Sequence, residues 1–224
     1  MARTIARTVA EGPGTRFAVW VQGCTIRCVG CFNPHLWAAR GGMPARAADL
    51  AAEAVAAGVD GVTFLGGEPF EQAAGLADVA RIVRAAGLSV MTFTGYELGS
   101  LLEAATDDAG VRGLLDATDL LVDGPYLADR PDRVRPWVGS TNQRFRFLSD
   151  RYRHLETDLG ALPDRVEVRV AVDGEVSLNG WAGVDQLDSL LAGSTRSLPG
   201  RSHARTGGDG RGDRGVGGRA PEDV

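Results

Sequence analysis

The chain has 224 residues, of which 44% are hydrophobic and 24% charged, a composition typical of a globular protein with one main domain. The formal net charge of −5 gives no overall attraction for nucleic acid, and no apolar run reaches the length of about 18 residues that predicts a membrane span. The N-terminus lacks the apolar segment of a secretory signal, so we expect a cytoplasmic protein whose thiols stay reduced.

Hydrophobic periodicity and turn residues predict strands that alternate with helices along the first 124 residues. Pro69 suits the first turn of one predicted helix, and Gly87 suits its end. Strands separated by helices need crossover connections, which predicts an α/β fold with a largely parallel sheet. The predicted strands cover 3–10, 16–22, 61–65, 88–93 and 119–124, and the predicted helices cover 46–57, 69–86, 97–105 and 111–117.

The C-terminal part of the chain gives weaker signals. Residues 125–150 are rich in Pro and charge and are interpreted as a long ordered loop that leads into a short helical or strand segment. Residues 165–181 alternate polar and apolar side chains around Asp173-Gly174, which predicts a β-hairpin with a tight turn. Residues 193–224 are rich in Gly and Arg, and their low apolar content predicts a disordered tail. The expected organisation is therefore one domain over 1–192 followed by this tail.

The number of strand–helix units limits the architecture. A closed eightfold barrel takes about 250 residues, so a partial, open β/α barrel is the better interpretation. In parallel sheets, ligands bind beyond the carboxyl ends of the strands. Four segments directly follow predicted strands and are expected to share one rim: the cysteine loop, Gly66-Gly67-Glu68, Thr94-Gly95-Tyr96 and Asp123-Gly124.

All three cysteines of the chain lie in one loop, with the spacing C-x3-C-x2-C. Such a cluster in a reducing compartment indicates metal or redox chemistry. Cys24, Cys28 and Cys31 would form a Cys3His zinc site together with His35. They would equally hold an iron–sulfur cluster, and because cubane clusters usually take four cysteines, one iron would then stay open to a substrate. The spacing alone leaves both interpretations open.

The segment GPGTRFAVWVQGCTIRCVGCFNPHLW resembles the opening of radical S-adenosylmethionine (SAM) enzymes, above all the activating enzymes of glycyl radical enzymes. It is most similar to the activators of anaerobic ribonucleotide reductase. Trp20 stands where that pattern usually has Phe. Further similar stretches follow in the same order, FLGGEPF, FTGYE and LLVDGPYLADR with GSTNQR, so the resemblance covers about residues 4 to 150. The matching residues of the opening are Gly12, Gly14, Arg16, Gly23, Cys24, Cys28, Cys31, Phe32 and Asn33, with Gly30 as in the reductase activators.

This resemblance implies a [4Fe–4S] cluster on Cys24, Cys28 and Cys31, with SAM chelating the open iron. One electron, supplied by a flavodoxin- or ferredoxin-type donor, would cleave SAM to methionine and a 5′-deoxyadenosyl radical. The protein would then place a glycyl radical on a partner enzyme. Glu68 would bind the amino group of SAM through a charge-assisted contact. The other cofactor-binding candidates are Gly30, Phe32, Asn33, Gly66, Gly67, Thr94 and Asp123.

Each candidate also has a purely structural alternative. Glu68 would suit the positive end of a helix dipole, Thr94 an ordinary turn and Asn33 the closure of its loop. Asp123 would bind the SAM ribose hydroxyls or a structural cation, or it would cap the following turn. Two other functions compete with activation of a partner enzyme. One is radical SAM modification of a peptide or small molecule, and the other is a zinc or electron-transfer module without catalysis.

Overall fold

The computed structural model describes residues 1–163, 165–170, 172–174 and 176–180. The predicted tail at 193–224 and the predicted domain boundary at 192 lie outside these residues. The strands are β1 (Arg3–Thr8), β2 (Arg16–Val21), β3 (Gly61–Gly66), β4 (Ser89–Phe93), β5 (Leu120–Asp123), β6 (Arg144–Phe147), β7 (Val166–Val170) and β8 (Val176–Gly180). The helices are α1 (Ala47–Ala56), α2 (Ala73–Ala85), α3 (Leu98–Ala104) and α4 (Ala109–Ala117), with 3-10 helices η1 (Pro34–Leu36), η2 (Pro69–Gln72), η3 (Asp150–Leu155) and η4 (Leu159–Ala161).

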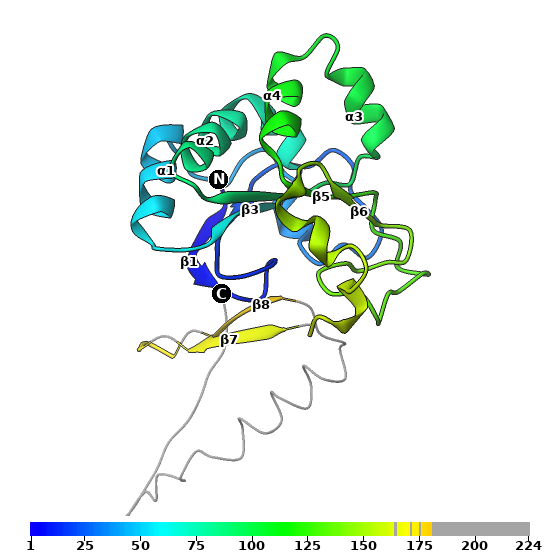
Figure 1. Ribbon diagram of the computed structural model, residues 1–224. Coiled ribbons are helices and arrows are strands. Elements are labelled where there is room, and N and C mark those ends of the chain that lie inside the picture. The colour runs from blue at the N-terminus through cyan, green and yellow to red at the C-terminus, as the bar shows by residue number, and fades with distance from the viewer. Residues whose placement is uncertain (164, 171, 175, 181–224) are drawn as a thin grey trace, which may run out of the picture. The chain divides into compact units, whose positions relative to one another are not determined.

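Six strands form one sheet in the order β1-β2-β3-β4-β5-β6. Strands β2 to β5 are parallel to one another, whereas the edge strands β1 and β6 are antiparallel to their neighbours. This arrangement confirms the predicted α/β fold with a largely parallel sheet (Figure 1). The sheet has two edges and does not close, and this strand order by itself does not define a barrel.

Two predicted elements differ from the structure in their extent. The predicted helix over 69–86 is two elements, η2 and α2, because the backbone of Gln72 leaves the helical region (φ −129°) between them. The predicted loop over 125–150 leads into β6, which extends the main sheet by pairing with β5. Phe145 and Phe147 alternate with arginines in this strand and pack against the hydrophobic cluster around Met91 and Leu120.

The two faces of the sheet bury different residues of the same strand, as the period of two in a strand requires. In β2, Phe17, Val19 and Val21 join the main core under the helices, whereas Ala18 and Trp20 pack on the opposite face. Helices α1, α2 and α4 lie together on one side of the sheet (Figure 1). The opposite face of β4 and β5 is covered by segments that contribute Val138 and Tyr152.

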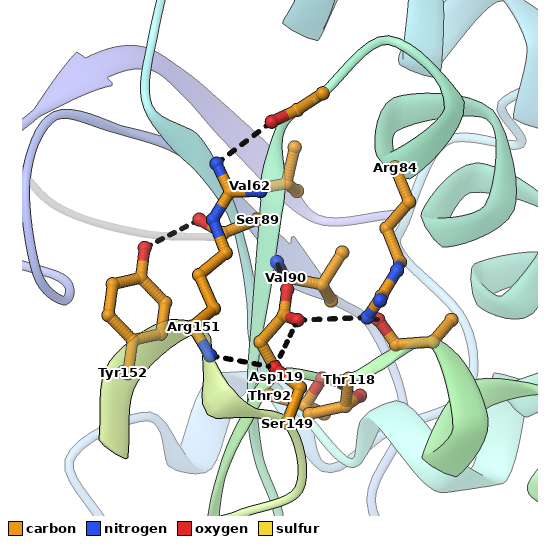
Figure 2. Close-up of polar contacts among 12 residues, drawn as sticks. Val62, Arg84, Ser89, Val90, Thr92, Thr118, Asp119, Ser149, Arg151 and Tyr152 are labelled. Carbon is orange, nitrogen blue, oxygen red and sulfur yellow. Dashed lines mark hydrogen bonds and ion pairs between the residues drawn. The ribbon is translucent and has the colours of Figure 1, made fainter. Parts of the chain in front are cut away.

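A buried carboxylate ties the last part of the main sheet together. Asp119 directly precedes β5 and is 2% exposed. Its oxygens accept hydrogen bonds from the Val90 backbone N–H at 2.8 Å, the Arg84 guanidinium at 2.9 Å and the Ser149 hydroxyl at 2.6 Å (Figure 2). The carboxylate therefore joins β4, α2 and the residue that caps η3.

A fully buried arginine performs a similar task near the start of the parallel strands. Arg16 is 0% exposed and donates to the Thr63 and Ser89 hydroxyls at 2.9 and 2.6 Å. It also donates to the Tyr152 hydroxyl of η3 at 2.9 Å. Arg16 thus crosslinks β2, β3 and β4 with η3, at the end of the strands remote from the cysteine loop.

Strands β7 and β8 form the predicted C-terminal antiparallel hairpin. Its turn contains Gly174 at φ +88°. The polar face of the hairpin contacts the segment after β1: Glu167 accepts from the Val9 N–H at 2.8 Å, and the Gly180 N–H donates to Glu11 at 2.8 Å. The hairpin is therefore held to the main domain by hydrogen bonds.

Candidate metal and cofactor site

The carboxyl ends of the parallel strands bring the four predicted segments to one edge of the sheet. The Gly67 N–H donates to the Val21 carbonyl at 2.8 Å, which joins the turn after β3 to the end of β2. The Thr94 N–H donates to the Val122 carbonyl at 2.9 Å, and the Gly124 N–H donates to the Tyr96 carbonyl at 2.9 Å. The four segments therefore lie along one edge of the sheet, and the Glu68 side chain links the turn after β3 to the turn after β4.

Gly66 and Gly67 are needed because this turn lies directly on the backbone of the cysteine segment. Gly66 has φ +109°, and a Cβ atom there would lie 2.7 Å from the Trp20 Cα. A Cβ atom at Gly67 would lie 2.2 Å from the carbonyl oxygen of Gly23. Cβ atoms do not approach other atoms so closely, so both positions require glycine. The close approach that the glycines allow is between two segments of the protein.

The cysteine loop begins and ends at neighbouring points of the backbone. The Gly23 N–H donates to the Leu36 carbonyl at 2.8 Å, and the Cys24 N–H donates to the Trp37 carbonyl at 3.1 Å. Between these points all three thiols are half-buried. The tip of the loop is open, since Val29 is 85% exposed. The three sulfurs are thus carried on a closed loop at the protein surface.

Backbone N–H groups face the sulfurs of this loop. The Asn33 N–H donates to the Cys31 sulfur at 3.4 Å. Burial raises the pKa of Cys24, while the backbone N–H groups of Arg27 and Ile26 act against this rise by favouring the thiolate. Burial likewise raises the pKa of Cys28, against the backbone N–H of Tyr126. Hydrogen bonds to cysteine sulfur are among the features that tune iron–sulfur clusters.

The donor set fits an iron–sulfur cluster better than one zinc ion. Within the part of the chain that the structure describes, no three His, Cys, Asp or Glu side chains are arranged to hold a single metal ion. The zinc set that would include His35 is therefore not assembled, and His35 is exposed. A cubane cluster binds each thiolate through a different iron, so its cysteines need not converge on one point.

Glu68 provides a buried carboxylate beside the cysteine loop. It is 1% exposed, and its oxygens accept hydrogen bonds from the Phe70 and Gly95 backbone N–H groups, both at 2.9 Å, and from the Thr94 hydroxyl at 2.8 Å. Burial raises the pKa of Glu68 to about 7 although these donors favour the ionised form. Among the described residues no cationic side chain forms an ion pair with it.

The structural alternative for Glu68 is also realised. Glu68 is the N-cap of η2, and its side chain accepts from the Phe70 N–H. Capping uses one oxygen, however, and the second oxygen accepts from Gly95 on the neighbouring strand end. The Thr94 hydroxyl completes the link, because it also accepts from the Tyr96 N–H at 3.1 Å. Glu68 therefore connects the ends of β3 and β4 rather than serving η2 alone.

Asp123 is placed at the same edge but is engaged by the protein itself. It is 2% exposed and accepts from the Leu98 N–H at 2.8 Å, at the first residue of α3. It also forms an ion pair with Arg146 of β6 at 2.8 Å. These contacts position the segment between β4 and α3. A contact between Asp123 and SAM stays a prediction.

Two further candidates, Gly30 and Phe32, lie against the segment that follows β5. Gly30 has φ +78°, and a Cβ atom there would lie 3.0 Å from the Ala128 Cβ. The Phe32 ring meets the Tyr126 ring edge-on, with centroids 5.6 Å apart. Tyr126 and Ala128 thus back the cysteine loop. Sequence reasoning missed them because they lie in a stretch that carries no periodic signal.

Sequence reasoning also missed a second set of contacts to the cysteine loop. Glu71 of η2 accepts hydrogen bonds from the backbone N–H and the hydroxyl of Thr25. The Gln72 side chain donates to the Gln22 carbonyl at 2.6 Å. Both residues lie in the first turn of the helix predicted over 69–86, and nothing in their spacing pointed to these contacts.

This chain belongs to the 4Fe-4S single cluster domain family, whose sequence pattern matches residues 10–146. That range begins before β2 and ends within β6, so it contains all four segments of the rim.

More particularly, the chain is similar to anaerobic ribonucleoside-triphosphate reductase-activating proteins. It is 29% identical over 147 residues to the protein of Escherichia coli strain K12, covering 60% of this chain and 90% of the relative. It is 30% identical over 147 residues to that of Vibrio cholerae serotype O1, covering 60% and 89%. The protein of Enterobacteria phage T4 is 29% identical over 142 residues, covering 60% and 85%.

Within the described ranges, no helix is both long enough and apolar enough to cross a bilayer.

Proposed function

We infer that this chain is a radical SAM activating enzyme that generates a glycyl radical on a partner, the partner being an anaerobic ribonucleoside-triphosphate reductase. The relatives are named as activating proteins of that reductase, and they match this chain over nearly their whole length. The observation that carries the inference is the placement of the three-cysteine loop beside the buried Glu68 at the carboxyl edge of a parallel sheet.

In this proposal Cys24, Cys28 and Cys31 hold a [4Fe–4S] cluster. When bound, the cluster and SAM supply a one-electron cleavage of the SAM carbon–sulfur bond, which gives methionine and a 5′-deoxyadenosyl radical that takes a hydrogen atom from the target glycine. The protein contributes position and the exclusion of water. Changing any one of the three cysteines to Ala is expected to abolish this cleavage.

Glu68 receives the amino group of SAM in this proposal. Its carboxylate is held by Thr94, Phe70 and Gly95, so the acceptor is oriented before a ligand arrives. An ammonium placed there would form a charge-assisted hydrogen bond in a buried site. Gly30, Phe32, Asn33, Gly66, Gly67 and Asp123 shape the same edge.

Within the α/β class, we propose that the fold is a partial, open β/α barrel of the radical SAM type. The parallel order of β2 to β5 and the helices on one side support it. In such an open arrangement the uncovered side would admit a loop of the partner enzyme, because little chain is left to build a closed pocket.

The electron donor we propose is an acidic carrier protein of the flavodoxin or ferredoxin type. Residues 12–48 contain no Asp or Glu, although the chain as a whole carries a net charge of −5. Arg3, His35 and Arg40 line a hollow of about 320 Å³ that also includes Asn33, the residue bonded to the Cys31 sulfur. This basic hollow is complementary to an acidic surface, and such complementarity mainly speeds encounter.

The proposal is tested by electron paramagnetic resonance on the partner. The protein is reconstituted with iron and sulfide without oxygen and mixed with SAM, dithionite and an anaerobic ribonucleoside-triphosphate reductase. A glycyl radical doublet on the reductase is expected, together with 5′-deoxyadenosine. Formation of 5′-deoxyadenosine without a radical on the reductase would instead indicate a peptide or small-molecule substrate. A colourless protein that holds zinc and leaves SAM intact would reject the proposal.

A further inference from the structure

The start of the cysteine loop is held by one carboxylate oxygen. Thr25, the residue after Cys24, donates its backbone N–H to Oε1 of Glu71 at 2.8 Å and its hydroxyl to the same oxygen at 2.6 Å. The Tyr96 hydroxyl donates to this oxygen as well, at 3.3 Å. Three donors therefore meet on a single acceptor that belongs to none of the segments predicted to bind the cofactor.

These contacts adjoin a ring of hydrogen bonds that closes on Glu71. From Glu71 the ring runs to Tyr96, whose N–H donates to the Thr94 hydroxyl. Thr94 in turn donates to Glu68, and the Glu71 N–H donates to the Glu68 carbonyl at 3.2 Å. The ring thus joins the turn after β3 to the turn after β4, and Thr25 attaches the cysteine loop to it at Glu71. The Glu71 side chain meets both the loop and the Tyr96 segment.

The η2 turn holds neighbouring points of the loop by other bonds. The Glu68 N–H donates to the Gly23 carbonyl at 2.7 Å, and the Gln72 side chain donates to the Gln22 carbonyl at 2.6 Å. Both of these contacts lie before Cys24. Glu71 holds the chain after Cys24, and it is therefore the contact that fixes the direction in which the chain leaves the first cysteine.

We propose that Glu71 is a positioning residue for the cluster ligands: through Thr25 it fixes the Cys24–Cys28 segment so that the three thiolates are arranged before the cluster binds. This inference rests on the proposed function in so far as the thiolates bind a cluster. Glu71 does not touch the sulfurs, and the hydrogen bonds of its carboxylate go to Thr25 and Tyr96.

The first test uses the protein without metal, so it does not depend on activity. Glu71→Ala removes the acceptor, and amide hydrogen exchange at Ile26, Arg27 and Cys28 is expected to rise at least about tenfold, as loss of hydrogen bonds to a charged group permits. Glu71→Gln keeps an acceptor oxygen at the same place, and its exchange is expected to stay near that of the parent. Glu103→Ala, an exposed glutamate of α3, serves as the matched control and should change nothing.

The second test uses the reconstituted protein and separates position from charge. Both Glu71→Ala and Glu71→Gln remove one negative charge, so a purely electrostatic effect would shift the reduction potential equally in both. If Glu71 acts by position, the electron paramagnetic resonance spectrum of the reduced cluster is broadened in the Ala variant. The reduction potential of the Ala variant then also shifts further from the parent value than that of the Gln variant. Thr25→Val loses the hydroxyl donor but keeps the backbone N–H, so its spectrum is expected to lie between those of the parent and Glu71→Ala. Thr25→Ser keeps both donors and is expected to retain the parent spectrum.

Three results would overturn the proposal. The first is unchanged exchange of Ile26–Cys28 in Glu71→Ala, and the second is identical spectra and potentials for the Ala and Gln variants. The third is a Thr25→Ser protein no closer to the parent than Thr25→Val. A failure of the proposed function is distinguishable, because a protein that binds zinc or does not cleave SAM would still show the exchange difference in its metal-free form.

Discussion

Glu68 is a buried carboxyl group without a cationic partner among the described residues, a combination that is rare in proteins. It is almost completely buried, and within the described residues its partners are neutral donors rather than a cation. Burial of a carboxyl group without a cation disfavours the charged form, and the pKa of Glu68 rises to about 7 as a result. A ligand ammonium would restore the charge balance. In the proposed function, the burial of this carboxyl group destabilises the protein without SAM, and the bound ammonium offsets that cost.

This raised pKa predicts a pH-dependent stability of the metal-free protein. The unfolded chain releases the Glu68 proton near pH 4.5, whereas the folded chain keeps it until about pH 7. The folded state therefore binds more protons in this window, and the free energy of unfolding should fall as the pH rises through it, by up to about 3 kcal/mol. Urea unfolding at pH 5 and pH 7.5 measures this loss.

The matched variant for this measurement is Glu68→Gln, which has no proton to release. Its stability should depend much less on pH in the same window. Some dependence should remain, since burial also raises the pKa of Glu11. A parent protein whose stability is flat or rises between pH 5 and pH 7.5 would disprove the role given to Glu68 burial.

Arg16 shows how a residue of the family pattern can serve the fold. Its guanidinium is fully buried and bonded to hydroxyls from β3, β4 and η3. We expect Arg16→Met to lower the free energy of unfolding by about 3 kcal/mol, because several buried acceptors lose their donor together. Urea unfolding measures this, with Arg81→Met, an exposed residue of α2, as a control expected within about 0.5 kcal/mol. Equal stability of the two variants would contradict the assignment.

At the scale of elements, the turn after β3 and the cysteine segment determine each other's position. Gly67 lies where any side chain would meet the Gly23 carbonyl, so Gly67→Ala must separate the turn from the loop. We expect this variant to lose about 2 kcal/mol or more of stability and to bind less iron on reconstitution. Iron analysis and thermal unfolding check both effects.

Gly75 offers the opposite case on the adjacent helix α2. A Cβ atom there would meet nothing within 4 Å, so Gly75→Ala should stabilise the protein by up to about 1 kcal/mol through helix propensity and leave iron binding unchanged. If Gly67→Ala reconstitutes as fully as Gly75→Ala, the close approach of the two segments is not needed by the site.

The strand–helix alternation made the parallel order of β2 to β5 predictable, and with it the shared edge of the cysteine loop and Glu68. Hydrophobic periodicity in a sequence reveals elements that bury one of their faces, and each of these strands and helices does so. The hydrogen bonds between Thr25 and Glu71 could not be predicted, because they join two exposed polar residues that only the fold brings together. The contact of Tyr126 with Phe32 could not be predicted because Tyr126 lies in a stretch without a periodic signal, and β6 was too short to separate from its surrounding loop.

At the scale of the whole molecule, charge is unevenly distributed. The acid-free stretch over 12–48 contains the cysteine loop, whereas Asp and Glu occur along the rest of the chain. Glu11, the acid just before this stretch, is 8% exposed and accepts from the hairpin. The hollow lined by Arg3, His35 and Arg40 therefore presents positive charge beside the loop.

This distribution predicts salt-dependent binding of an acidic carrier. Arg40→Glu should weaken binding of a plant-type [2Fe–2S] ferredoxin about tenfold at an ionic strength of about 0.01 M, and the difference should vanish near 1 M, where charges are screened within about 3 Å. Isothermal titration calorimetry measures both affinities. Arg81→Glu, on α2, is the control with the same change of net charge, and an equal effect in both variants would rule out the hollow as the docking face.

The central claim is that three cysteines hold a cluster whose remaining iron is open to SAM. The measurement that tests it most directly is electron–nuclear double resonance on the reduced, reconstituted protein with SAM labelled by ¹⁵N in its amino group and ¹⁷O in its carboxylate. We predict couplings from both labels, and their loss in Cys24→Ala, Cys28→Ala and Cys31→Ala. A cluster that shows neither coupling, or that is fully ligated by the protein's own side chains, would contradict the account.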